Sequence, residues 1–360
     1  MTVRGASAGD PALVDGLARR IREDGPVTFA AFMEAALHDP RTGYYASGPD
    51  RLGRTGDFFT ASDVGTAFGG CIARQLEEID GVLGRPPVVH AIVFGAGRGL
   101  LARDVLDALA ERGSTLSSRM RYVAVDRSEG MRARIRAQVP ESDVLAPAEL
   151  DDGPGGRVGC VLAVELLDAL PVHRVRRRSG RLLEIAVDLG TPDGRAAFVE
   201  REVAPSRPVE DEVERWGLAP EDGDEAEVCL ALAPQLRTLA SAIDRGFLIV
   251  VDYGHDAREL AGRAHRRGTL LAYHGHATNE SFLERVGRQD LTAHVNWSAL
   301  EHHATEAGFT PVGRTTQDRF LIANGILERF EQQDDADRRD PLRVKGRLQA
   351  MQLIHPHGMG

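Results

Sequence analysis

The sequence predicts an α/β fold built on a mostly parallel sheet with helices on both faces. Between residues 87 and 254, short apolar runs typical of buried strands alternate with amphipathic helical segments. Parallel strands need crossover helices, so this alternation favours a parallel sheet. A glycine-rich loop, GAGRG at 95–99, follows the first strand and precedes a helix. Loops in this position bind ligands at the carboxyl end of the sheet.

The first 85 residues predict helices joined by loops, ahead of the sheet. Leu13, Leu17 and Ile21 recur at four-residue spacing, which is the pattern of an amphipathic helix. A second helix is predicted to begin after Thr28, whose side chain is suited to capping its first turn. A glycine-rich loop comes next, and a third helix is predicted over about 64–79.

The elements of the sheet then follow in order along the chain. Strands are predicted at 87–94, 121–126, the first half of 158–171 and 247–254, and helices at 100–112 and 129–139. The stretch 173–189 predicts a hairpin that turns at Ser179 and Gly180. The region near 190–235, rich in Asp, Glu, Gly and Pro, is expected to be an insertion between strands, and 326–360 a C-terminal helical tail.

Charge and composition argue against several classes of protein. The formal net charge of -10 disfavours nucleic acid as the main partner, because phosphate binding needs a basic face. The sequence contains no run of about 18 apolar residues, so no membrane span is predicted. The N-terminus lacks the apolar segment of a secretory signal. Cys71, Cys160 and Cys229 lie far apart in apolar contexts, which predicts reduced thiols in a cytoplasmic protein.

The glycine loop and the end of the second strand together predict a nucleoside ligand. Gly95, Gly97 and Gly99 permit positive φ angles and close approach of ligand atoms, although a tight turn between strand and helix is the simpler alternative. Asp126 can accept two hydrogen bonds from a ribose diol, or it can cap the next helix. Because the spacing is not G-x-G-x-x-G, the pair favours S-adenosylmethionine (SAM) over NAD.

Two carboxylates follow the strand within 158–171, in the stretch VELLDALP. If this stretch is a helical turn, Glu165 and Asp168 share a face because they are three residues apart. A carboxylate pair there is able to clamp a guanidinium or another cation with several donors. The alternative is that both residues cap the next turn, which is the commoner role for carboxylates in loops.

The 12 histidines show no H-x-x-x-H or H-E-x-x-H spacing, so no metal site is predicted. His294, in QDLTAHVNW, is the best candidate among them for a general base or a substrate contact. The alternative, which we favour, is a residue at a helix start that hydrogen-bonds Asp290.

Several longer stretches resemble one family. In order they are FMEAALHDPRTGYYAS, GDFFTASDVGTAFGGCIA, FGAGRGLLARDVL, ELLDALPV, VVDYG, GTLLAYHGHA and GRQDLTAHVNWSALEHHATEAGF, from about residue 26 to residue 325. The chain resembles the MidA family of class I SAM-dependent methyltransferases, which includes the mitochondrial complex I assembly factor that methylates a protein arginine. The stretches GDFFTAS and QDLTAHVNWSAL are specific to this family, whereas the glycine loop is shared by all class I methyltransferases.

The resemblance implies a Rossmann-like class I methyltransferase domain with a mostly parallel seven-stranded sheet at 86–325. Residues 1–85 would form a helical segment that covers the cofactor cleft. The implied contacts to SAM are Gly95, Ala96, Gly97 and Gly99 at its methionine part, Asp126 at its ribose with Arg127 beside it, and Asp57, Phe58 and Thr60 in a closing loop. Glu165, with Asp168, would lie where the methyl group is delivered, and Tyr44 and Tyr45 would wall the acceptor pocket.

Two departures from the family keep three functions open. Val93 stands where the family usually has a glutamate that orients the SAM amino group, and Val164 where it usually has asparagine. Losing one charge-assisted hydrogen bond costs roughly 1.5–3 kcal/mol. The expected activity is methyl transfer to protein arginine. The alternatives are a small-molecule N- or O-methyltransferase, or a SAM-binding assembly factor with little turnover. No nucleic-acid or membrane partner is expected, and a homodimer is an option.

Overall fold

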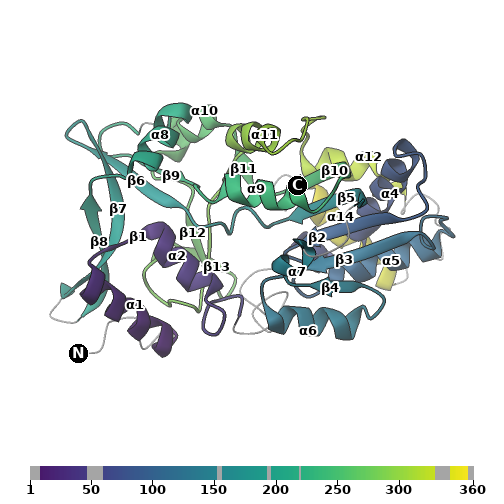
Figure 1. Cartoon of the computed structure of the whole chain (residues 1–360), viewed down its shortest axis with the longest axis horizontal. Helices are drawn as coiled ribbons and strands as arrows, with labels where there is room; N and C mark the ends of the chain where they lie inside the picture. Colours follow the sequence, from purple (N-terminus) through teal and green to yellow (C-terminus); the bar gives the residue numbers. More distant parts are fainter. Residues whose placement is uncertain are drawn as a thin grey trace.

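A computed structural model describes residues 9–46, 60–151, 156–192, 196–218, 220–328 and 341–355. The described chain forms two lobes side by side, one built on a parallel sheet and the other on an antiparallel sheet (Figure 1). We call them the parallel-sheet lobe and the antiparallel lobe. None of the helices described is long and apolar enough to cross a membrane.

The parallel sheet has the order β10-β5-β2-β3-β4. Its strands are β2 (Val89–Phe94), β3 (Met120–Val125), β4 (Asp143–Leu145), β5 (Val158–Val164) and β10 (Arg245–Val251). The order reverses between β2 and β5, and ligands of such sheets bind at the carboxyl ends of the strands beside this point. In the described residues the sheet has five strands and not the expected seven, because the chain after β10 forms short strands that pair with one another.

Alternate residues of the parallel strands face two separate cores. Val93 and Ala124 face one core, and Ile92 and Val125 face the other. The first core is covered by α4 (Ala67–Val82), α5 (Leu100–Glu111), α6 (Glu129–Gln138), α12 (Gln317–Ala323) and α14 (Pro341–Ile354). The second is covered by α7 (Pro147–Asp151), α9 (Leu232–Ser241) and α11 (Trp297–Glu306). Both faces are therefore covered, as predicted, and Val93, which is 3% exposed, belongs to a packed core.

The antiparallel lobe contains the predicted hairpin. Its sheet comprises β1 (Val27–Thr28), β6 (His173–Arg178), β7 (Arg181–Gly190), β8 (Ala197–Val203) and β9 (Glu225–Val228). Ser179 and Gly180 have φ angles of 51° and 75°, as a two-residue hairpin turn requires, so the predicted turn is confirmed. The excursion from the parallel sheet begins before the hairpin and not near residue 190, because the hairpin strands pair with β9 and β1 in this second sheet.

The described residues of the N-terminal range 1–85 are divided between the two lobes. Helices α1 (Pro11–Asp24) and α2 (Phe29–His38) pack against β7 and β8 and against a small sheet. That sheet is formed by β12 (Leu271–His274), β13 (Ala277–Asn279) and β14 (Asp290–Thr292). Thr28 caps α2 as predicted, its Oγ1 accepting from Ala31 N at 3.1 Å. The third predicted helix is α4, which packs against α5 and follows a separate short helix, α3 (Ala61–Val64).

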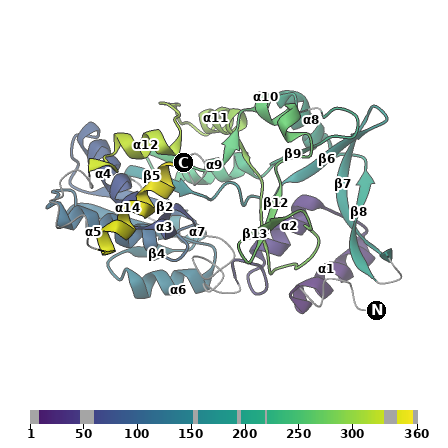
Figure 2. The ribbon, with the colours of Figure 1, turned by 180° about the vertical axis from the view of Figure 1, so that it is seen from behind.

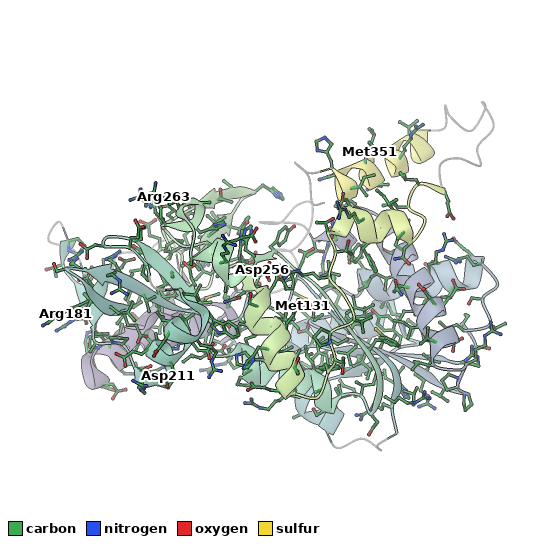
Figure 3. All side chains as sticks on the ribbon, turned by 90° about the horizontal axis from the view of Figure 1, so that it is seen from above. Met131, Arg181, Asp211, Asp256, Arg263 and Met351 are labelled. Atoms are coloured by element: carbon green, nitrogen blue, oxygen red, sulfur yellow. The ribbon has the colours of Figure 1, made fainter. Side chains whose placement is uncertain are left out.

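The C-terminal helix α14 lies against α12 and α4 of the parallel-sheet lobe, as the reverse view shows (Figure 2). Ala350 and Leu353 are 1% and 0% exposed in the first core. Leu348 and Met351 of the same helix are 66% and 48% exposed. Figure 3 shows Met351 on the outer side of the helix. The described part of the tail is therefore a packed element of the parallel-sheet lobe.

Candidate active site

The glycine loop lies at the carboxyl end of β2, beside the point where the strand order reverses. Gly95, Gly97 and Gly99 have φ angles of 66°, 54° and 78°, which side chains rarely tolerate. A Cβ atom on Gly95 would lie 2.8 Å from Leu166 Cδ1, so this glycine lets the loop after β2 pack against the loop after β5. A Cβ atom on Gly97 would be in ordinary van der Waals contact, 3.9 Å from Gly95 O, so the positive φ and not crowding favours glycine there.

Asp126 follows β3 and fixes the glycine loop from the neighbouring strand. Its Oδ2 accepts from Gly97 N at 3.1 Å, and its Oδ1 accepts from Ser128 N at 2.8 Å. Burial raises the pKa of Asp126, although these two hydrogen bonds oppose the rise. Ser128 is the N-cap of α6 and accepts from Met131 N, so the alternative role of Asp126 as that cap is wrong. The role of Asp126 in binding ribose hydroxyls stays a prediction.

Arg127 lies at the rim of this site and joins the two lobes. Its Nη2 is 2.7 Å from Glu34 Oε1 on α2, and the two side chains are 60% and 42% exposed. The guanidinium is therefore engaged by the antiparallel lobe, next to the strand end that carries Asp126.

The segment that begins at Thr60 is attached to the glycine loop. Thr60 N donates to Asp63 Oδ2 at 2.9 Å, and Asp63 forms an ion pair with Arg98 of the loop. Thr60 is thus placed beside the predicted cofactor site. Asp57 and Phe58, which the family resemblance assigns to the same closing loop, lie outside the described residues.

Glu165 occupies a strained position at the end of β5. Its φ angle is 48°, in the left-handed region that favours glycine, and its backbone N donates to Val251 O at 2.8 Å. Its Oε1 accepts from Ala61 N, the first residue of α3, at 2.8 Å. Strain of this kind collects at functional sites, where the surrounding structure holds it in place.

Asp252, at the end of β10, holds the turn that follows Glu165. One oxygen of Asp252, Oδ2, accepts from Leu166 N at 3.1 Å and from Leu167 N at 2.8 Å, and Oδ1 accepts from Tyr253 N at 2.9 Å. The carboxyl ends of β5 and β10 are adjacent because the two strands pair in parallel. Asp252 therefore positions both carboxylates that the sequence singled out.

Four carboxylates influence one another here: Glu165, Asp168, Asp252 and Asp290 of β14. Burial, with the charge of Asp252, raises the pKa of Glu165 to about 8. Burial raises the pKa of Asp252 to about 6. Burial and the charges of Asp252, Asp290 and Glu165 hold the pKa of Asp168 well above its usual range. We call these four residues the carboxylate cluster; it favours protons or a cationic ligand.

Tyrosines adjoin the carboxylate cluster. Burial and nearby carboxylates raise the pKa of Tyr45, Tyr253 and Tyr273. Tyr45 OH donates to Asp290 Oδ1 at 2.8 Å, and Tyr253 is 44% exposed, so the cluster lies close to the surface. Tyr44 is 1% exposed and packs in the core of the antiparallel lobe, because adjacent residues point to different sides. Of the two tyrosines expected to line the acceptor pocket, only Tyr45 lies beside the carboxylate cluster.

Sequence reasoning missed Asp252, Asp290, Tyr253 and Tyr273 as site residues. A signal for Asp252 was present, because it follows an apolar strand of the parallel sheet as Asp126 does. Asp290 stands in one of the family-specific stretches, at a spacing that local patterns do not explain. Tyr273 pairs with Asp290 across β12 and β14, and only the sheet register reveals this.

His294 does not lie at the helix start that its favoured role requires, and its ring lies among other histidines. It lies between β14 and the two-residue strand Val295–Asn296, ahead of the helix start, and its ring faces those of His255 and His265 at centroid distances of 5.1 and 6.2 Å. Burial lowers its pKa to about 4. With Arg174 it lines a cavity of about 400 Å³ whose lining includes no member of the carboxylate cluster. A general base for chemistry at Glu165 is therefore not placed there.

In the part of the chain that the structure describes, His302, His303 and Glu306 of α11 bring potential metal ligands within 4.8 Å of one another. Arg215 of α8 (Arg207–Trp216) donates to His302 Nε2 at 3.3 Å, and His303 Nδ1 is 2.9 Å from Glu306 Oε2. These partners make the group a network of polar contacts between α8 and α11.

Replacing Asp126 with alanine is expected to weaken SAM binding at least tenfold. The change removes acceptors for the ribose hydroxyls and releases Gly97 N, and each charge-assisted hydrogen bond contributes roughly 1.5–3 kcal/mol. Calorimetric titration with SAM measures the loss. Asp211→Asn, on the exposed side of α8 (Figure 3), is the control and should bind as the wild type does. Unchanged affinity in Asp126→Ala would remove this residue from the cofactor site.

Comparisons with known proteins point to one family. Residues 71–315 match the family model described as "Putative S-adenosyl-L-methionine-dependent methyltransferase". The chain is 28% identical over 325 residues to the mitochondrial protein arginine methyltransferase NDUFAF7 homolog of Drosophila melanogaster, covering 84% of this chain and 72% of that protein. It is 26% identical over 371 residues to human NDUFAF7, covering 95% and 79%.

A solved structure matches the whole arrangement. A COG1565 superfamily member from Burkholderia thailandensis, crystallised with S-adenosyl-homocysteine, superimposes with a TM-score of 0.84 at 30% identity. The match covers 97% of this chain and 89% of that one. The resemblance noted in the sequence and the expected cofactor are thereby confirmed. With more than half of its length matched by the family model, the chain belongs to this family of SAM-dependent methyltransferases.

Proposed function

We propose that this methyltransferase acts on a nitrogen of an arginine side chain in a protein. The carboxylate cluster carries the proposal, because three of its members, Glu165, Asp168 and Asp252, follow the ends of β5 and β10 beside the glycine loop. Of the described residues, none forms a salt bridge with Glu165, Asp168 or Asp252. Burial without a paired cation raises the pKa of each of the three, so each keeps its proton to a higher pH than an exposed carboxyl group does.

A guanidinium suits this cluster better than a neutral acceptor does. It carries a permanent positive charge and five N–H donors in a planar fork, which matches carboxylate oxygens in pairs. Tyrosine faces beside the carboxylates add favourable contact with a cation. The printed names of the relatives, protein arginine methyltransferases, support the same acceptor class. The 44% exposure of Tyr253 favours an acceptor that reaches the cluster from the surface of another protein.

The residues of the chain divide the work of methyl transfer. SAM supplies a methyl group bonded to a positively charged sulfur, which leaves with the electron pair of that bond. The glycine loop and Asp126 bind and orient the cofactor, while Glu165 and Asp168 hold the acceptor nitrogen in line with the methyl carbon. As the new N–C bond forms, that nitrogen loses one proton to a carboxylate of the cluster. Asp252 keeps the turn that carries Glu165 and Asp168 in place.

The cellular setting is part of the proposal. Cys71, Cys160 and Cys229 are free, and the first two are buried. Free thiols of this kind support a reducing compartment such as the cytoplasm.

The test uses two peptides that differ only in charge. One is acetyl-Gly-Gly-Arg-Gly-Gly-amide, and the other has citrulline, the neutral analogue, in place of arginine. Methylation of the arginine peptide, followed by mass spectrometry with SAM as donor, is expected at a rate about 100-fold or more above that of the citrulline peptide. Binding of SAM without methylation of the arginine peptide, but with methylation of a small-molecule amine or hydroxyl compound, would favour the small-molecule enzyme instead.

A further inference from the structure

Asp290 is the member of the carboxylate cluster that comes from the antiparallel lobe. It begins β14 in the small sheet that packs on α1 and α2, opposite Tyr273 of β12, and it is 1% exposed. Glu165, Asp168 and Asp252, in contrast, stand on loops at the ends of β5 and β10. A ligand at the cluster therefore meets carboxylates from both lobes.

The orientation of Asp290 is fixed by two donors on one oxygen. Tyr45 OH lies 2.8 Å from Oδ1, and Leu291 N lies 3.0 Å from the same atom. Tyr45 is itself held by stacking on His38, with ring centroids 5.4 Å apart and an interplanar angle of 25°. The His38 Nε2 atom is 3.2 Å from Ala169 O, in the loop that follows Glu165 and Asp168.

Backbone contacts bring the same loop against the segment after β14. Ala293 N donates to Asp168 O at 2.9 Å, so the Asp168 backbone and the strand that begins with Asp290 are joined directly. Tyr45 OH contacts the Asp290 carboxylate directly, and burial together with the charge of Asp290 raises the pKa of Tyr45 and of Asp168. Asp168 and Asp290 thus face one region from opposite lobes.

We propose that Asp290 binds the acceptor cation directly and determines specificity for it, with Tyr45 as the positioning residue. This inference rests on the proposed function, since it assigns a second contact to the same acceptor. Glu165 and Asp168 hold the nitrogen that receives the methyl group. Asp290 accepts from another N–H of the same guanidinium. The antiparallel lobe then selects the acceptor, while the parallel-sheet lobe binds the cofactor.

The chemistry of the guanidinium explains why two lobes are needed. Its N–H donors lie on more than one edge of a plane, so carboxylates on opposite sides satisfy donors that one pair leaves free. A compact amine such as lysine presents its donors at a single point. Losing Asp290 should therefore reduce discrimination for arginine more than it reduces the chemical step.

The experiment compares Asp290→Asn and Tyr45→Phe with the wild type and with Asp211→Asn. Each protein is titrated with SAM and then assayed with the arginine and citrulline peptides defined above. Asp290→Asn is expected to raise KM for the arginine peptide tenfold or more, to lower the arginine-to-citrulline ratio of kcat/KM by a similar factor, and to bind SAM normally. Tyr45→Phe, which leaves the carboxylate in place, should show a smaller change in the same direction.

The outcomes separate this inference from the proposal on which it rests. If the wild type binds SAM but does not methylate the arginine peptide, the proposed function fails and this inference fails with it. If the wild type methylates arginine and both Asp290→Asn and Tyr45→Phe retain its KM and its preference over citrulline, only the inference is overturned. Because Tyr45→Phe keeps every backbone contact and the ring, it gives an answer even if Asp290→Asn does not fold.

Discussion

Replacing Asp252 with alanine is expected to lower kcat for methyl transfer about 100-fold and to lower the melting temperature by several degrees. The carboxylate accepts from Leu166 N, Leu167 N and Tyr253 N, and each donor left without a partner costs about 1–3 kcal/mol. The turn that orients Glu165 and Asp168 then loses its support. Turnover with the arginine peptide and thermal unfolding measure the two effects.

Asp252→Asn separates the support of the turn from the negative charge. An asparagine oxygen can still accept from the turn, so this variant is expected to keep most of the melting temperature while kcat falls. Both variants are expected to bind SAM with the affinity of the wild type, because Asp252 lies at the acceptor side of the site. If Asp252→Ala melts and turns over as the wild type does, the positioning role of this residue is wrong.

The second large effect is a dependence on pH. The pKa of Glu165 is raised by burial from 4.5 to about 8, so the folded protein binds this proton more tightly than the unfolded chain does. The free energy of unfolding should therefore fall as pH rises between about 5 and 8, by up to about 1.4 kcal/mol per pH unit for one such proton. Asp252, with a pKa of about 6, adds to the slope in the lower part of this range.

Acceptor binding should show the opposite trend, because the ionised cluster attracts a cation. Over the same pH range kcat/KM for the arginine peptide is expected to rise, up to tenfold per pH unit. Thermal unfolding and initial rates between pH 5.5 and 8.5 test both trends. Glu165→Gln, which cannot ionise, should flatten the stability slope, whereas Asp211→Asn should leave it as in the wild type. A stability that rises with pH through this window would contradict the raised pKa.

Local patterns explain most of what the sequence predicted correctly. Apolar strand segments and helical segments alternate along the sequence. The sequence therefore predicted β2, β3, β5 and β10 close to their observed bounds. The hairpin turn at Ser179 and Gly180 follows from the residues that tolerate positive φ. Glu165 and Asp126 were placed in the site because parallel strands bring their carboxyl ends to one edge.

Long-range pairing explains what the sequence did not show. The hydrogen bond between Tyr45 and Asp290 joins residues 245 positions apart, and no local pattern predicts it. Tyr44 and Tyr45 are adjacent, yet one enters a core and the other reaches the cluster, because the turn after α2 decides their directions. His294 was linked to the site by its place in a motif, but the sheet register turns its ring toward His255 instead.

The central claim is that a cluster of carboxylates beside the cofactor binds a cationic acceptor. Its most direct test is calorimetric titration of the protein, saturated with S-adenosyl-homocysteine, with the arginine and citrulline peptides at pH 7 in two buffers of different ionisation enthalpy. The structure predicts that the arginine peptide binds with release of protons, and that the citrulline peptide binds at least about tenfold more weakly without release. Equal binding of the two peptides, or arginine binding with no proton released, would contradict it.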